Sequence, residues 1–125
     1  MELSGCRILI VEDEEDIRET LKDFFESEGC IVTTACHGKA ALNELRSNEA
    51  PHLILLDLMM PVMNGEEFVS HKNAHAHWNQ IPILIMSADH HAAERAEAMN
   101  VKWCILKPLS LNRLVSMAEE ALSVA

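Results

Sequence analysis

An uninterrupted apolar run from Leu53 to Leu56 leads directly into Asp57, and a turn-rich segment that ends at Gly65 follows. Consecutive apolar residues bounded by turn residues are typical of a strand that is buried on both faces of a parallel sheet. Open α/β sheets bind ligands at the carboxyl ends of their strands, because helices cover both faces and leave only the strand ends accessible. The carboxylate of Asp57 is therefore the first candidate for chemistry in this chain.

Four other segments have a similar strand-like character and alternate with helical patterns. We predict strands over residues 8–11, 31–35, 53–57, 82–87 and 103–106, and helices over residues 17–25, 40–45, 92–99 and 111–122, with one more helix beginning after Gly65. This alternation indicates a parallel sheet with right-handed crossovers and helices on both faces. A length of 125 residues predicts a single domain that spans residues 1–125.

Some side chains have predictable places in such a fold. Polar residues that follow Val69, among them Lys72, leave the helix after Gly65 only a thin apolar face. We expect Trp78 to close the core before the fourth strand. Met59, Met60 and Met63 are expected to fill gaps under their loop, and Leu111, Leu114, Val115, Ala118 and Leu122 to point inward from the last helix.

Charge and cysteine content exclude several classes of protein. A formal net charge of −10 opposes direct binding to nucleic acid phosphates or to an anionic membrane, so we expect neither as a partner. The four cysteines form no CxxC pair, which favours buried, reduced thiols. The sequence shows neither a signal peptide nor an apolar run of transmembrane length. We therefore expect a cytoplasmic protein.

Polar and charged residues follow four of the predicted strands. The carboxyl edge of a parallel sheet would receive Glu12 and Asp13 from the first strand, Asp57 from the third, Ser87 from the fourth and Lys107 from the fifth. Crowded carboxylates repel one another, so at least one must take up a proton or the group must bind a cation. Oxygen ligands at an open edge suit Mg²⁺, which keeps part of its water shell and accepts a phosphate oxygen. A nucleophilic carboxylate, a metal and a lysine together suit phosphoryl transfer.

At this point the sequence resembles the receiver domain of bacterial response regulators, the CheY-like superfamily, over essentially its whole length. The resemblance rests on five features in order: Glu12 with Asp13, Asp57, the Met60, Pro61 and Gly65 loop, Ser87 with Ala88, and Lys107 with Pro108. It implies a flavodoxin-like, doubly wound sheet of order 2-1-3-4-5. It also implies a switch in two-component signalling rather than an enzyme that acts on an external substrate.

The resemblance assigns a role to each residue of the site. Asp57 would be the phosphoacceptor. Mg²⁺ would be held by Asp13, Asp57 and the backbone carbonyl of Met59, with Glu12 acting through water. Lys107 would contact the phosphoryl group, the bond from Lys107 to Pro108 would be cis, and Ser87, followed by Ala88, would be the switch hydroxyl that moves onto the phosphate.

The partners that the resemblance implies are proteins. A histidine kinase or a phosphotransfer protein would deliver the phosphoryl group near the first helix. A downstream protein target would bind the surface of the fourth helix, the fifth strand and the fifth helix. Many members of the family dimerise through that surface, so a homodimer is a further candidate.

One position departs from the family. The aromatic residue that usually lies three positions before the lysine is Cys104 here, and strand alternation places neighbouring Trp103 on the opposite face. The aromatic part of the switch is therefore in question. This departure favours an alternative function, a receiver-fold module that binds a protein independently of phosphate.

Plainer interpretations remain for individual residues. Glu12 and Asp13 could merely favour a helix amino end, Ser87 could cap a helix, and Lys107 could be a solvated loop cation. The histidines invite a zinc site, but spacing places no third ligand and they fit solvated surface better. A small phosphatase using Asp57 as its nucleophile ranks last, because haloacid-dehalogenase phosphatases want a second acid where this chain has Met59.

Overall fold

A single parallel sheet forms the centre of the computed structural model, which describes residues 3–123. Its strand order is β2-β1-β3-β4-β5, which confirms the predicted flavodoxin-like topology. The strands are β1 (Arg7–Val11), β2 (Ile31–Ala35), β3 (Leu53–Asp57), β4 (Ile83–Ser87) and β5 (Trp103–Leu106). The helices are α1 (Glu15–Ser27), α2 (Gly38–Ser47), α3 (Gly65–Asn73), α4 (Ala92–Ala98) and α5 (Leu111–Ser123).

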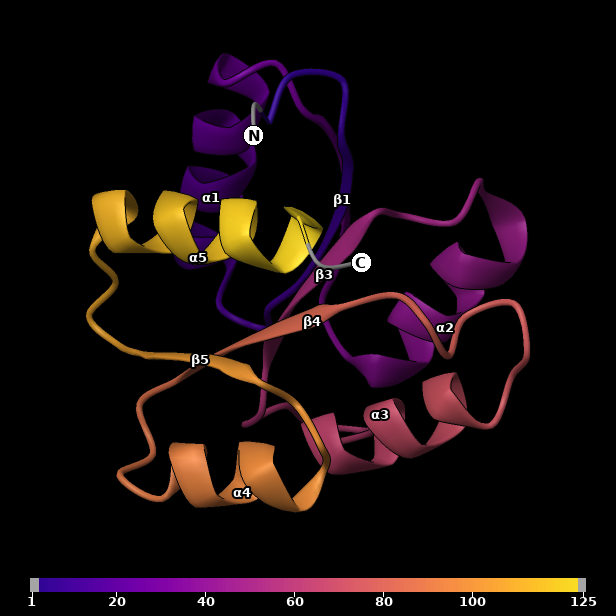
Figure 1. Ribbon diagram of the computed structural model, residues 1–125. Coiled ribbons are helices and arrows are strands. Elements are labelled where there is room, and N and C mark those ends of the chain that lie inside the picture. Colours follow the sequence, from indigo (N-terminus) through magenta and orange to yellow (C-terminus); the bar gives the residue numbers. More distant parts are fainter. Residues whose placement is uncertain (1–2, 124–125) are drawn as a thin grey trace.

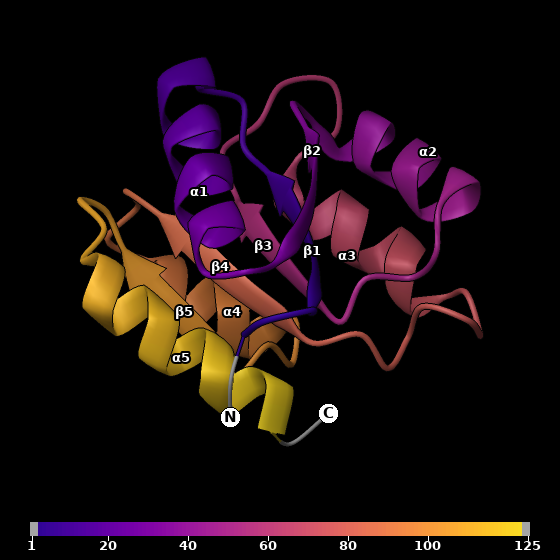
Figure 2. The same ribbon diagram turned by 90° about the horizontal axis from the view of Figure 1, so that it is seen from above.

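Helices cover both faces of this sheet. Figures 1 and 2 show α1 and α5 on one face and α2, α3 and α4 on the other. Strand β3 is buried along its whole length because alternate side chains enter the two cores. Leu53 and Leu55 pack on the side of α1 and α5, whereas Ile54 and Leu56 pack on the side of α2, α3 and α4. This arrangement leaves only the strand ends for chemistry.

Helix α3 begins with a capping box that holds the loop after β3 in place. The Asn64 side chain accepts from the amide of Glu67 at 2.9 Å, and the Glu67 side chain accepts from the amide of Asn64 at 3.3 Å. A Cβ atom on Gly65 would lie only 2.6 Å from the Leu58 side chain, so glycine permits a close approach here. Helix α3 has the thin apolar face that the sequence predicts, but Lys72 is buried along with that face.

Three expectations about packing were wrong. Met59 is 58% exposed and does not fill the core, although Met60 is buried and Met63 half-buried, because the β3–α3 loop turns Met59 outward. Leu111 lies at the exposed start of α5, whereas Leu114, Ala118 and Leu122 point inward as predicted. Cys36 is exposed because it follows the last residue of the edge strand β2, while Cys6 and Cys30 are buried.

Trp78 lies where the sequence predicts, in the core before β4. The exposed ring of His75 stacks on it, with ring centroids 3.8 Å apart. Within residues 3–123, no helix has the length and hydropathy that a membrane-spanning segment needs.

Candidate functional site

Strand register brings the predicted residues to one edge of the sheet. Val11 pairs with Leu56, so the next residues, Glu12 and Asp57, leave the sheet side by side. Asp57 pairs with Met86, which places Ser87 one step further along the neighbouring strand. Ser87 pairs with Leu106, and Lys107 follows; the Lys107 amide donates to the Ser87 carbonyl at 2.8 Å. The register of the strand pairs therefore places all of these residues at one edge of the sheet.

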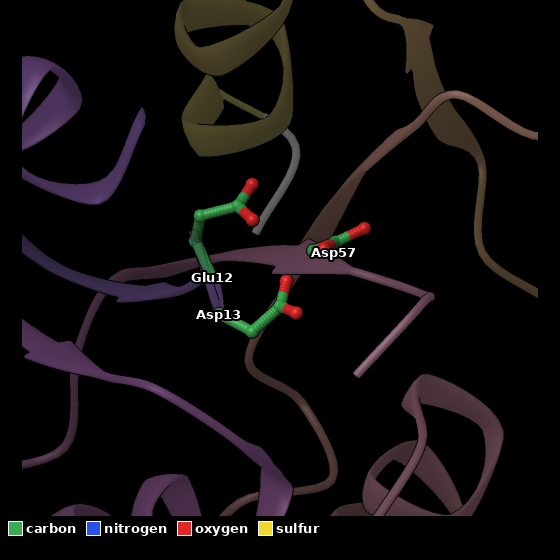
Figure 3. Close-up of side chains that lie close together, drawn as sticks. All are labelled: Glu12, Asp13 and Asp57. Carbon is green, nitrogen blue, oxygen red and sulfur yellow. The ribbon is translucent and has the colours of Figure 1, made fainter. Parts of the chain in front are cut away.

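Three carboxylates lie close together at this edge. Glu12, Asp13 and Asp57 each offer an oxygen atom, and these atoms lie within 4.8 Å of one another. Figure 3 shows Glu12 and Asp13 at the end of β1 with their carboxylates on the side of Asp57. Glu12 and Asp57 are buried whereas Asp13 is exposed, so a solvated ligand can reach the group from the Asp13 side.

Without a bound cation, the surroundings of Asp57 disfavour its ionised form. Burial and the negative charge of Glu12 raise the pKa of Asp57 to about 7. The positive charge of Lys107 acts in the opposite direction, as does the Met59 amide, which donates to Asp57 Oδ1 at 3.2 Å. A cation that replaced the proton would relieve the same repulsion.

Lys107 joins two of the carboxylates. Its Nζ donates to Glu12 Oε1 at 2.8 Å and lies 3.7 Å from Asp57 Oδ2. Burial alone would lower the pKa of Lys107, but the hydrogen bond to Glu12 and the charge of Asp57 outweigh it and raise the pKa. The ammonium is therefore a fixed positive charge beside the Asp57 oxygens. The peptide bond between Lys107 and Pro108 is cis.

Ser87 is fully buried at the end of β4. Its Oγ accepts from the Asp89 amide at 3.1 Å, which leaves the hydroxyl proton available for donation. Ala88 is exposed in the loop between them.

The donor set fits Mg²⁺. Carboxylate and carbonyl oxygens are its preferred protein ligands, and a single ammonium does not balance three carboxylates. Met59 lies two residues beyond Asp57, so its backbone carbonyl is available at the same loop. Among the described residues, the three acids form the one group of potential metal ligands, and no histidine belongs to it.

The structure adds a charged network that the sequence analysis missed. Arg95 of α4 forms a two-pronged ion pair with Glu66 of α3 and contacts Asp89 Oδ2 at 2.8 Å. The guanidinium lowers the pKa of Glu66. Because Asp89 also holds Ser87 Oγ, the network ties α3 and α4 to the loop that carries the serine. Glu66 and Arg95 are 29 residues apart, so no local spacing indicates their contact.

Cys104 is half-buried on the side of α2, α3 and α4, whereas Trp103 belongs to the core on the other face. The two residues therefore point apart, as strand alternation predicts. Burial raises the pKa of the Cys104 thiol, which keeps it protonated. The aromatic ring of the family is not replaced by Trp103.

The fold and the site define a class: a doubly wound α/β protein with an acidic, lysine-containing site at the carboxyl edge of its sheet. The family model described as the response regulator receiver domain matches residues 8–119. This chain therefore belongs to the receiver domains of two-component signalling, which confirms the resemblance seen in its sequence.

Individual relatives agree with this assignment. The chain is 39% identical over 118 residues to the Regulator of RpoS from Escherichia coli K12, and the match covers 92% of this chain and 34% of that protein. It is 34% identical over 118 residues to an uncharacterized 14.6 kDa protein from Leptolyngbya boryana, covering 90% of this chain and 89% of that one. The chain thus spans about a third of the Escherichia coli relative but most of the other.

A solved structure has the same fold. The signal receiver domain of a signal transduction histidine kinase from Syntrophus aciditrophicus superposes with a TM-score of 0.87 at 27% identity. The match covers 97% of this chain and 92% of that domain.

Proposed function

We propose that this chain is a phosphorylation-controlled switch in which Asp57 accepts a phosphoryl group from a histidine kinase or a phosphotransfer protein. The observation that carries the proposal is the position of Asp57, beside Glu12 and Asp13 and with Lys107 Nζ 3.7 Å from Oδ2. This arrangement presents a carboxylate nucleophile between acidic groups that can hold a cation and an ammonium that can hold phosphoryl oxygens.

The transfer conserves the phosphoryl group. An oxygen of ionised Asp57 attacks phosphorus, and the bond from phosphorus to the histidine nitrogen of the donor breaks. The donor imidazole keeps the electron pair of that bond and takes a proton from solvent. Hydrolysis reverses the state of Asp57, because water then attacks phosphorus and inorganic phosphate leaves with the aspartyl oxygen restored to the carboxylate.

Different residues of the site would bind the metal ion and stabilise the phosphoryl oxygens. Asp13, Asp57 and the carbonyl of Met59 would hold Mg²⁺, with Glu12 acting through water. When bound, Mg²⁺ offsets the negative charge that gathers on the phosphoryl oxygens. Lys107 stabilises the same oxygens from the other side, because it already lies beside Asp57. Positioning and charge therefore account for most of the rate enhancement.

Switching would follow from Ser87. Its hydroxyl proton can be donated to a phosphoryl oxygen if Ser87 and Ala88 move toward Asp57. Movement there would strain the Asp89 and Arg95 contacts and so reach α4. A downstream protein, or a second copy of the chain, would then bind the surface formed by α4, β5 and α5. We place this signalling in the cytoplasm, with no direct nucleic acid or membrane partner.

A second candidate function is favoured by Cys104. Without the aromatic ring, coupling between Ser87 and the output surface can be weak, and the chain would then bind its partner whether or not it is phosphorylated. Binding of a partner to beryllofluoride-treated wild type and to Asp57→Ala under the same conditions separates the two functions. Equal affinities would support the phosphate-independent module and contradict the switch.

Phosphorylation itself is tested with acetyl phosphate and Mg²⁺. Intact mass should show the addition of one phosphoryl group to the wild type and none to Asp57→Asn. Asp23→Asn is the matched control, since Asp23 is an exposed acid on α1, and it should be modified like the wild type. A wild type that stays unmodified, and that also fails to bind beryllofluoride, would refute the proposal.

A further inference from the structure

An open cavity lies at the edge of the sheet opposite to Asp57. Its volume is about 370 Å³, and it is bordered by the carboxyl end of α3, the segment before β4 and the loop between α4 and β5. Figure 1 shows α3 and α4 on the same face of the sheet, with the chain leaving α4 toward the start of β5. Nothing in the proposed signalling reaction uses this region.

Lys72 gives the cavity its chemical character. Only 4% of the residue is exposed, and Nζ donates to Asn73 Oδ1 at 3.1 Å and to the Asn79 carbonyl at 3.3 Å. Both acceptors are neutral, and no carboxylate of residues 3–123 forms an ion pair with Lys72. Burial lowers the pKa of Lys72 to about 8, so the group is still mostly protonated at neutral pH. A buried cation with neutral partners gains much from an anion.

Lys102 also lines this cavity and carries a second ammonium group. The lining contains no aspartate or glutamate, although the chain carries 20 acidic residues. The cavity therefore has two neighbouring cations and no competing carboxylate.

The remaining wall is apolar. Ile81 and Ile83 are buried beside the cavity, and Met99 and Val101 are half-buried on its other side. Cavities of roughly 300 Å³ and above accommodate small molecules rather than single ions. An anion with a short hydrocarbon chain matches both parts of the lining.

We propose that this cavity binds a small organic carboxylate, with its charged end at the Lys72 and Lys102 ammonium groups and its hydrocarbon part against Met99 and Val101. The site is separate from Asp57 and does not depend on phosphorylation. A short ligand of this kind should bind with a dissociation constant on the order of 1 mM.

Backbone amide signals make the proposal measurable by nuclear magnetic resonance. Hexanoate is titrated into the ¹⁵N-labelled chain at constant pH and ionic strength. The amide signals of Asn79 and Val101, which line the cavity, should shift and saturate, whereas the amide signal of Glu12 at the opposite edge of the sheet should change little. Failure of the Asn79 and Val101 signals to saturate would overturn the proposal.

Charge dependence is tested with matched ligands and variants. Hexanamide has nearly the same shape without the charge and should bind about tenfold more weakly, as should hexanoate to Lys72→Met. Lys39→Met removes an exposed lysine from α2 and should leave hexanoate binding unchanged. Equal binding of hexanoate and hexanamide to the wild type would overturn the proposal even if Lys72→Met did not fold. Inorganic phosphate that bound as tightly as hexanoate would overturn the role of the apolar wall.

Discussion

Replacing Asp57 by asparagine should stabilise the chain when no divalent cation is present. In the folded protein the ionised carboxylate is buried beside Glu12, and its pKa rises from 3.8 to about 7. A raised acid pKa means that the folded state binds the proton more tightly than the unfolded state does. The stability that this group contributes is therefore complete below about pH 4 and is lost as the pH rises through 7.

The magnitude follows from the same shift. A displacement of about three pKa units corresponds to at most about 4 kcal/mol at pH 8, since each unit is worth 1.36 kcal/mol. Rearrangement of Lys107 and of water reduces the benefit, so we expect Asp57→Asn to gain about 2 kcal/mol at pH 8 and less than half of that at pH 5.

Urea denaturation in the presence of EDTA measures this difference at the two pH values. Asp23→Asn is the control for loss of one exposed negative charge on α1 and should change stability by less than about 0.5 kcal/mol. Excess Mg²⁺ should then stabilise the wild type more than Asp57→Asn, which reverses the order seen in EDTA. If Asp57→Asn were no more stable than the wild type at pH 8, or if its gain were the same at pH 5, the electrostatic description of the site would be wrong.

Two other predictions test the surroundings of the site. Arg95→Met should free the Ser87–Asp89 loop and speed phosphorylation of Asp57 by acetyl phosphate roughly threefold, while lowering the free energy of unfolding by about 1 kcal/mol. Arg113→Met, which changes an exposed residue of α5, is the control. A slower or unchanged rate in folded Arg95→Met would show that Arg95 does not restrain the loop. Val62→Asn should raise the free energy of unfolding by about 0.5–1 kcal/mol, because Val62 is 72% exposed and has a φ of 68°, a left-handed conformation that asparagine tolerates better. Thermal unfolding measures this gain, and a lower melting temperature would show that the loop is not strained there.

The backbone of this chain was predictable because its signals are local and repeated. The apolar run before Asp57 is continuous and buried throughout, and the stripe of α5 follows the helical period with Leu114, Ala118 and Leu122 buried. The convergence at the carboxyl edge needed only the parallel direction of the strands. Parallel strands all end at the same edge of the sheet, so the topology alone places the residues that directly follow them.

Side chains whose places depend on distant partners were not predictable. Lys72 has the polar character of a solvent-exposed helix position, but the segment between Asn73 and Asn79 folds over it and supplies its acceptors. Arg95 finds Glu66 only because α3 and α4 lie on the same face. The apolar side chain of Met59 predicts a buried position, but the turn after β3 directs it outward. In each case the deciding contact is made by another part of the chain.

The pairing of Val11 with Leu56 and of Asp57 with Met86 also limits which changes this protein can accept. Sliding β3 by one residue would present Leu56 or Leu58 where the nucleophile now lies and would turn every leucine of the strand to the opposite layer. A loop at the edge of the sheet opposite the site can change in length without altering these strand pairings. We therefore expect insertions to be tolerated best in loops at the edge of the sheet opposite the site. An insertion or deletion within β1, β3 or β4 should disrupt the site.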